Sequence, residues 1–419
     1  MIGPLALVAM AGVPAITAPL SEEQAVEMAL HNSPQVKFRG HFVDEAEAKT
    51  DVALSWNNPQ LRFTGLRYDQ LLEPAFDRRS YGNHPFDHAS IGLRWSPPGL
   101  GERHARRAEG LANEADARME LAITRRDTTA LVRKLHAEIL SYDAQLALGK
   151  DVIEQRTKLR ALVKSRVEQQ AATLLDQSLS EVDYLDAVTQ FAELEVRRRA
   201  AYDELLVQLG LPAGQTIALA PGDKDACTAP EDAAKLAEQA HAANPRLRLL
   251  RAQLDAVDAE RRRRWLDLVP WFDYLQVSHL MAGDNHPSYI AFQLQLTLPL
   301  FDWKRPHRRA LSARKEGLLE RIHADDRALS DLVLRTTAAQ AEQATLVQRY
   351  REAASVVEGG LAHLRQALEQ GQITNLVQVV QLQTRLLATQ RSYLRAQLDC
   401  KLQQIELDRI TSTGLDGEH

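Results

Sequence analysis

Residues 290–298 read IAFQLQLTL, an alternation of apolar residues with polar or small ones at a period of two. Successive side chains of a β-strand point to opposite faces. Phe292, Leu294 and Leu296 therefore share one apolar face, while Gln293 and Gln295 lie on the other. Weaker forms of this alternation recur in three other segments. Together they predict four strands, at about residues 60–68, 88–97, 271–280 and 288–298.

The predicted strands have the length of strands that cross a membrane, about 9–11 residues when tilted. Apolar residues outside and polar residues inside are typical of a membrane barrel with a water-filled lumen. A soluble sandwich would show the same alternation with its apolar face turned inward, so the pattern alone leaves both open. On the barrel interpretation Phe292, Leu294 and Leu296 face lipid.

All five tryptophans lie near predicted junctions between helices and strands, at positions 56, 95, 265, 271 and 303. Tryptophan is enriched where a membrane meets water. Four of them form the predicted interfacial belt: Trp56, Trp95, Trp271 and Trp303. The alternative is that these side chains cap a soluble core.

The sequence contains a tandem repeat of predicted structural elements. A short helix pattern, a strand pair and a very long helical stretch occur once before Gly210 and again after Pro230. Such duplication is a strong architectural signal. We predict repeat 1 over residues 19–220 and repeat 2 over 221–419. The apolar residues 1–18 are interpreted as a signal peptide that lacks its basic start, and on this interpretation we expect the true start to lie upstream. The alternative is a frayed N-terminal tail.

Two long segments are helical by periodicity. Apolar or small residues from Val132 to Ile153 recur in alternating steps of three and four, which is a heptad seam. No proline interrupts residues 103–211 or 307–415. A helix of about 65–75 residues is roughly 100 Å long and must pair along its length. Each repeat is therefore predicted to end in a long helical hairpin. A plain two-stranded coiled coil would show the same periodicity.

Four strands per chain cannot close a barrel, and an open sheet edge cannot face lipid. Three copies would supply twelve strands, the smallest closure that leaves an open pore. The predicted fold class is mainly α with a transmembrane β segment: duplicated long helical hairpins and four strands per chain, with twelve strands closing a β-barrel in a homotrimer.

Composition and motifs exclude several classes of protein. The net charge of −5 and pI near 6.2 argue against nucleic-acid binding. No nucleophile elbow, phosphate loop or metal-binding motif occurs, so we expect no enzyme, no cofactor and no metal site. No apolar stretch of about 20 residues is available for a transmembrane helix. Cys227 and Cys400 are interpreted as unpaired thiols, because no bridge between them follows from the sequence.

Several short motifs resemble the TolC-type outer-membrane efflux channel family. Residues 20–25 and 32–34 look like its opening helix, 209–212 like its mid-chain join, and 298–302 like its second strand-to-helix turn. Residues 180–187 and 371–377 resemble the tips of its two helical hairpins. The resemblance covers residues 21 to about 414. Each motif is weak alone, and their order and duplication make the set specific.

This resemblance implies a homotrimer in the outer membrane of a Gram-negative cell, with a long α-barrel in the periplasm. The tips would dock a periplasmic adaptor that is bound to an inner-membrane pump. The predicted docking residues are Ser180, Gly371 and Thr374, and Asp183 and Asp186 could form a carboxylate ring at the pore mouth. The sequence departs from the family pattern at two positions that affect these tips. Gln177 stands where the family usually has glycine, and Val377 stands where it usually has an acidic residue.

The leading hypothesis is a passive conduit for efflux or secretion, driven by a partner pump. The alternative is a periplasmic coiled-coil scaffold that joins partners without conducting. A periplasmic scaffold does not need strands with an apolar face suited to lipid, or tryptophans at the junctions of helices and strands. These strand features therefore discriminate between the conduit and the scaffold.

Overall fold

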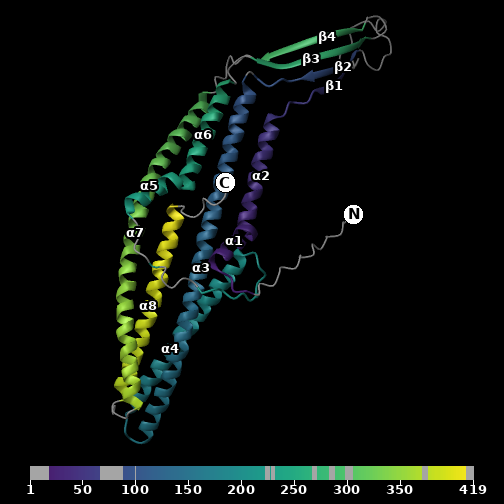
Figure 1. Ribbon diagram of the computed structural model, residues 1–419. Helices are drawn as coiled ribbons and strands as arrows, with labels where there is room; N and C mark the ends of the chain where they lie inside the picture. The colour runs from purple at the N-terminus through teal and green to yellow at the C-terminus, as the bar shows by residue number, and fades with distance from the viewer. Residues whose placement is uncertain are drawn as a thin grey trace, which may run out of the picture. The chain divides into compact units, whose positions relative to one another are not determined.

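The computed structural model describes residues 18–66, 88–99, 101–221, 227, 232–266, 271–282, 288–297, 305–369 and 376–411 (Figure 1). The prediction of a mainly helical chain with four strands is confirmed in this part of the chain. The first half contains α1 (Glu22–Asn32), α2 (Pro34–Leu54), β1 (Gln60–Leu66), β2 (His88–Trp95), α3 (Glu102–Glu168) and α4 (Leu174–Gln208). The second half contains α5 (Ala233–Ala243), α6 (Pro245–Leu266), β3 (Trp271–Ala282), β4 (Tyr289–Thr297), α7 (Arg305–Glu369) and α8 (Leu376–Thr411). Most of the predicted signal peptide lies outside the described residues.

The chain divides into two compact units, and each takes segments from both halves of the sequence. The described parts of Met1–Gly40, Glu120–Leu247 and Ala324–His419 make up the first, here called the helical unit. The described parts of His41–Met119 and Arg248–His323 make up the second, the sheet unit. The compact units therefore do not coincide with the two repeats, which describe the order of elements along the chain.

The sheet unit contains one antiparallel sheet with the order β1-β2-β3-β4. Register partners across it include Leu61 with Leu93, Leu93 with Val277, and Val277 with Phe292. A β-bulge between Phe272 and Tyr274 interrupts the pairing of β3 with β4. Within the described residues β1 and β4 each pair on one side only, so they form the two edges of the sheet.

The helical unit holds two equivalent apolar clusters. In the first, the α1 alanines Ala25 and Ala29 pack against α3 and α4. In the second, Leu236 and Ala240 of α5 pack against α7 and α8. The heptad seam predicted in α3 supplies three fully buried members of the first cluster: Val132, Leu135 and Ile139. Apolar burial of this kind, at about 25 cal/mol per Å², is what stabilises the otherwise solvated long helices.

A histidine lies inside the first cluster. His136 is 1% exposed, and its Nε2 atom lies 3.4 Å from the carbonyl oxygen of Leu20. Burial lowers the pKa of His136, because the apolar surroundings disfavour the charged imidazolium. The fold therefore favours the neutral form of this side chain.

The hairpin of α3 and α4 is tightly packed at one point. Gly149 of α3 faces Phe191 of α4, and a Cβ atom at position 149 would lie 2.1 Å from the Phe191 ring. The guanidinium of Arg391 also lies near this ring, 5.6 Å from the Phe191 ring centroid. Any larger residue at position 149 would therefore force the Phe191 ring to move.

The interpretation of the two cysteines as unpaired was wrong. Cys227 and Cys400 form a disulfide with their Cα atoms 5.8 Å apart. Cys400 is completely buried in α8, next to Val347 and Ala396, and Cys227 packs against the same cluster. The partners are separated by 173 residues, so no local spacing could reveal the bond.

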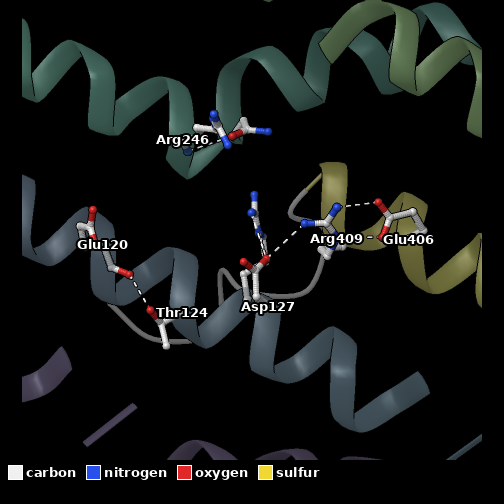
Figure 2. A network of polar contacts seen from close by, with 8 residues as sticks. Glu120, Thr124, Asp127, Arg246, Glu406 and Arg409 are labelled. Atoms are coloured by element: carbon white, nitrogen blue, oxygen red, sulfur yellow. Dashed lines mark hydrogen bonds and ion pairs between the residues drawn. The ribbon is translucent and has the colours of Figure 1, made fainter. Parts of the chain in front are cut away.

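Polar contacts join α8 to the helices of repeat 1 (Figure 2). The Arg409 guanidinium donates to Glu406 and to Oδ1 of Asp127, at 3.3 Å for the latter, and Figure 2 shows both contacts. The Glu406 carboxylate and then Asp127 hold the pKa of Arg409 above its usual value. Further along α8, Arg391 donates to Oε1 of Gln190 at 2.6 Å. This seam between repeats is ionic and amide-based, unlike the apolar clusters within each repeat.

Candidate functional site

One face of the sheet is covered with exposed apolar side chains. Phe292 is 80% exposed, Phe63 70% and Leu294 53%. The register places the following side chains on this apolar face: Leu61, Phe63, Ile91, Leu93, Trp95, Phe272, Leu275, Val277, His279, Met281, Ile290, Phe292, Leu294 and Leu296. His279 is the single titratable member among them. Phe292, Leu294 and Leu296 thus lie together on one exposed surface, as their spacing predicted.

The opposite face of the same sheet is polar. It carries these residues: Gln60, Arg62, Thr64, Ser90, Gly92, Arg94, Tyr274, Gln276, Ser278, Leu280, Tyr289, Ala291, Gln293 and Gln295. Gln276 donates to the Ser278 hydroxyl at 2.8 Å, and the Arg94 guanidinium lies 3.7 Å above the centroid of the Tyr274 ring. Gly92 leaves room for Ser278, whose hydroxyl would lie 2.5 Å from an added Cβ atom. The sheet therefore separates an apolar surface from a hydrogen-bonding one.

Aromatic residues gather where the helices meet the sheet. The rings of Trp56 and Trp95 lie 6.0 Å apart between centroids. The Trp95 indole donates to the carbonyl oxygen of Asn57 at 3.1 Å, and the Arg103 guanidinium lies 4.4 Å from the Trp56 ring centroid. Trp265, exposed at the end of α6, was not in the predicted belt. Trp271 is the first residue of β3, and Trp303 lies outside the described residues.

The reversal of the first helical hairpin lies earlier than predicted. The expected tip, residues 180–187, is inside α4, and the chain turns at 169–173 instead. The physical reason is a capping box: the Thr173 hydroxyl accepts from the backbone N–H of Asp176, and the Asp176 carboxylate accepts from that of Thr173. Gln170, with φ of 56°, makes the turn.

The predicted docking residue Ser180 is buried, and its hydroxyl donates to the carbonyl oxygen of Gln177 at 2.8 Å. Exposed apolar side chains occupy the start of α4 instead: Leu174, Leu175, Leu179, Val182 and Leu185. Sequence reasoning missed them, although the run Leu174-Leu175 beside the capping box was a usable signal. Gly371 and Thr374, the docking residues predicted in repeat 2, lie outside the described residues.

The two aspartates predicted at the pore mouth are both exposed on α4. Asp183 accepts from the Arg156 guanidinium of α3 at 2.5 Å, and Asp186 accepts from Gln190 at 2.9 Å. Asp183 is therefore partly neutralised within its own hairpin, a pairing that its sequence position did not reveal. Asp186 has no cationic partner in the described part of the chain.

None of the described helices contains an apolar stretch that meets the requirement for crossing a bilayer. Neither a family model nor a curated protein matches the sequence. Solved structures do match. A membrane protein from Pseudomonas aeruginosa has a TM-score of 0.76 at 20% identity, with 93% of this chain and 90% of that chain covered. The open state of the MtrE outer membrane channel of Neisseria gonorrhoeae has a TM-score of 0.73 at 13% identity, with 94% and 89% covered.

The outer membrane protein VceC of Vibrio cholerae gives a TM-score of 0.70 at 13% identity, with 93% of this chain and 95% of that chain covered. At sequence identities this low, the similarity to these structures shows a shared fold only. This chain has the fold of solved outer-membrane channels over nearly its whole length, as the resemblance of its motifs predicted.

Proposed function

We propose that this chain is one subunit of an outer-membrane channel, a passive conduit from the periplasm to the cell exterior. The observation that carries this proposal is the two-faced sheet. Burying large apolar side chains contributes about 1.5–3 kcal/mol each, so a soluble protein would cover Phe63, Phe292 and Leu294 rather than expose them. A lipid environment satisfies this face, and water in a lumen satisfies the polar one.

The two sheet edges indicate how many copies assemble. An unpaired row of backbone N–H and C=O groups is costly in a bilayer. The edges β1 and β4 can pair with each other only between different copies. Three copies give twelve strands and an open lumen. The proposed assembly is therefore a homotrimer, with the long helices forming a second barrel in the periplasm.

The disulfide supports an exported location. Disulfides persist in oxidising compartments, of which the bacterial periplasm is one. The Cys227–Cys400 bond lies in the helical unit, which is the part that the proposal places in the periplasm.

Reconstitution tests the conduit directly. The purified protein should be a trimer by native mass measurement and should produce step-like ion currents in a planar bilayer. A monodisperse monomer that keeps its strand content and never conducts would instead support the periplasmic scaffold.

Coupling to a pump is the finer part of the proposal. The channel would work in a tripartite system, with a periplasmic adaptor at the hairpin tips and an inner-membrane pump supplying the energy. The exposed pair Leu174 and Leu175 at the first tip supports an apolar docking contact. Leu174→Ser with Leu175→Ser should lower efflux in cells and leave the trimer in the membrane. Val196→Ser, equally exposed further along α4, is the matched control.

Docking through Gly371 and Thr374, and a carboxylate ring of Asp183 and Asp186, remain proposals. Three copies would bring six carboxylates to the pore mouth, which would favour cations. Asp183→Asn with Asp186→Asn should then reduce the cation preference in single-channel recordings. Because Arg156 already offsets Asp183, Asp186→Asn alone should account for most of the change. An unchanged ion preference in the double variant would remove the ring from the proposal.

A further inference from the structure

The helix ends that adjoin the sheet are rich in arginine. Three eight-residue stretches contain ten arginines and four carboxylates: Glu102–Glu109 at the start of α3, Asp258–Trp265 at the end of α6, and Arg305–Ser312 at the start of α7. The chain as a whole has a net charge of −5. The positive charge is thus concentrated at one place in an otherwise acidic protein.

The antiparallel order of the sheet brings these three ends to the same side. The last residues of β2 and β4 and the first residues of β1 and β3 lie at one end of the sheet, because Gln60 pairs with Arg94 and Trp271 with Thr297. Helices adjoin the strands there after short connections (Figure 1). Contacts confirm that the ends are neighbours: Arg263 of α6 pairs with Glu109 of α3 at 3.1 Å.

All four carboxylates of these stretches are already paired with cations. Their ion pairs are Glu102 with Arg106, Glu109 with Arg263, Asp258 with Lys315, and Glu260 with Arg264. Five arginines are exposed and have no ion pair with any residue in the described ranges: Arg107, Arg261, Arg262, Arg305 and Arg309. We call these five the arginine belt. The neighbouring end of α2 contributes one exposed carboxylate, Asp51, which leaves the excess clearly positive.

Helix dipoles do not account for the belt. Arginine at a helix C-terminus is favourable, which would explain Arg261 and Arg262. At an N-terminus the same charge is unfavourable, yet α7 begins with Arg305 and has no acidic residue in its first turn. Arg107 and Arg309 also lie near N-terminal ends. An external anion is the simplest source of compensating charge.

The surroundings of the belt indicate which anion. The belt adjoins the apolar sheet face and the exposed indoles of Trp56 and Trp265. Indoles concentrate at the headgroup level of a bilayer, so in the proposed channel the belt would lie at the depth of the lipid phosphates. Guanidinium groups bind phosphate oxygens in a fork geometry that ammonium groups cannot offer. We propose that the arginine belt binds the phosphate groups of anionic phospholipids in the leaflet on the helical side of the sheet.

This proposal rests on the proposed membrane channel, and the experiment keeps the two apart. The full-length trimer is mixed with vesicles of equal parts phosphatidylglycerol and phosphatidylcholine and then repurified. Each basic residue near an anionic surface favours it by about fivefold. We therefore expect phosphatidylglycerol to be enriched at least about fivefold in the retained lipid. The enrichment should shrink from about 0.1 M to about 1 M salt, as the screening length shortens.

The belt variant carries Arg261→Gln, Arg262→Gln, Arg305→Gln and Arg309→Gln, which leaves Arg107 as the one belt residue in place, and its phosphatidylglycerol enrichment should fall to less than about half that of the unchanged protein. The control variant loses the same charge from exposed arginines of the helical unit, at Arg197, Arg199, Arg349 and Arg395. The control should retain the original enrichment. Both variants should still form conducting trimers, because neither set lies on the polar face of the sheet.

Three results would overturn the lipid proposal: no enrichment in the unchanged protein, full enrichment in the belt variant, or equal loss in the control. A belt variant with unchanged lipid but reduced efflux in cells would assign the belt to a protein partner instead. Failure of the unchanged protein to conduct in any lipid would count against the channel itself.

Discussion

Replacing Gly149 with alanine should loosen the α3–α4 hairpin, although alanine is the better helix former. The added Cβ atom would lie 2.1 and 2.2 Å from two carbons of the Phe191 ring, where about 3.5–4.0 Å is a normal separation. The ring would therefore have to move by more than about 1 Å, which also changes its contact with the Arg391 guanidinium. Overpacking of this kind costs about 1–3 kcal/mol.

The helical preference of alanine over glycine offsets about 0.5–1 kcal/mol of that cost. At the middle of both ranges the net loss is about 1.3 kcal/mol, which corresponds to roughly a tenfold change in a local opening equilibrium. Amide hydrogen exchange of the detergent-solubilised trimer reports this opening. Amides of α3 and α4 around Gly149 and Phe191 should exchange about tenfold faster in the variant.

Two further variants separate the effect of the clash from the effect of helix propensity. Gly317→Ala, in α7, meets nothing within 4 Å, so it should slow local exchange through helix propensity alone. Combining Gly149→Ala with Phe191→Leu removes the clash, and the pair should show a favourable coupling of about 1–2 kcal/mol. If Gly149→Ala slows exchange as Gly317→Ala does, the ring yields freely and the tight packing assigned to this site is refuted.

Three other changes are expected to have defined outcomes. Leu294→Arg should cost about 2–4 kcal/mol at the bilayer midplane and abolish membrane trimers on gels, whereas Gln293→Arg on the polar face should assemble; the reverse result would contradict the assigned strand phase. Reducing the disulfide should destabilise the chain by about 2–5 kcal/mol, seen as a lower temperature of trimer dissociation, and Cys400→Ser should make that temperature insensitive to reductant. Because burial lowers the pKa of His136, the neutral form is favoured in the fold; the associated stability is present above about pH 6.5 and is lost as the pH falls below it, so His136→Gln should flatten the pH dependence of thermal stability.

The features that periodicity in the sequence predicted correctly are those that depend only on neighbouring residues, namely which face of a strand or helix a side chain occupies. A period of two fixes which face of a strand each side chain takes, so the alternation by itself places Phe292, Leu294 and Leu296 on one face, and the register of β4 confirms it. The heptad seam likewise placed Val132, Leu135 and Ile139 on one buried side of α3.

The features that escaped prediction depend on long-range or dispersed signals. The Cys227–Cys400 bond joins residues 173 positions apart and has no local signature. The hairpin reversal did have one, the capping box of Thr173 and Asp176, but no glycine or proline marks it. The arginine belt is assembled from three helix ends, and only the sheet order shows that they meet.

The disulfide also constrains how the chain matures. Cys227 and Cys400 can bond to each other within one chain in only one way, so oxidation between these two positions cannot produce a wrong intramolecular bond. Cys227 precedes its partner by 173 residues, and its thiol must remain unreacted until α8 has followed. The hazard during that interval is a bond between two chains. A cell lacking a disulfide isomerase but retaining a thiol oxidase should therefore mature this protein normally.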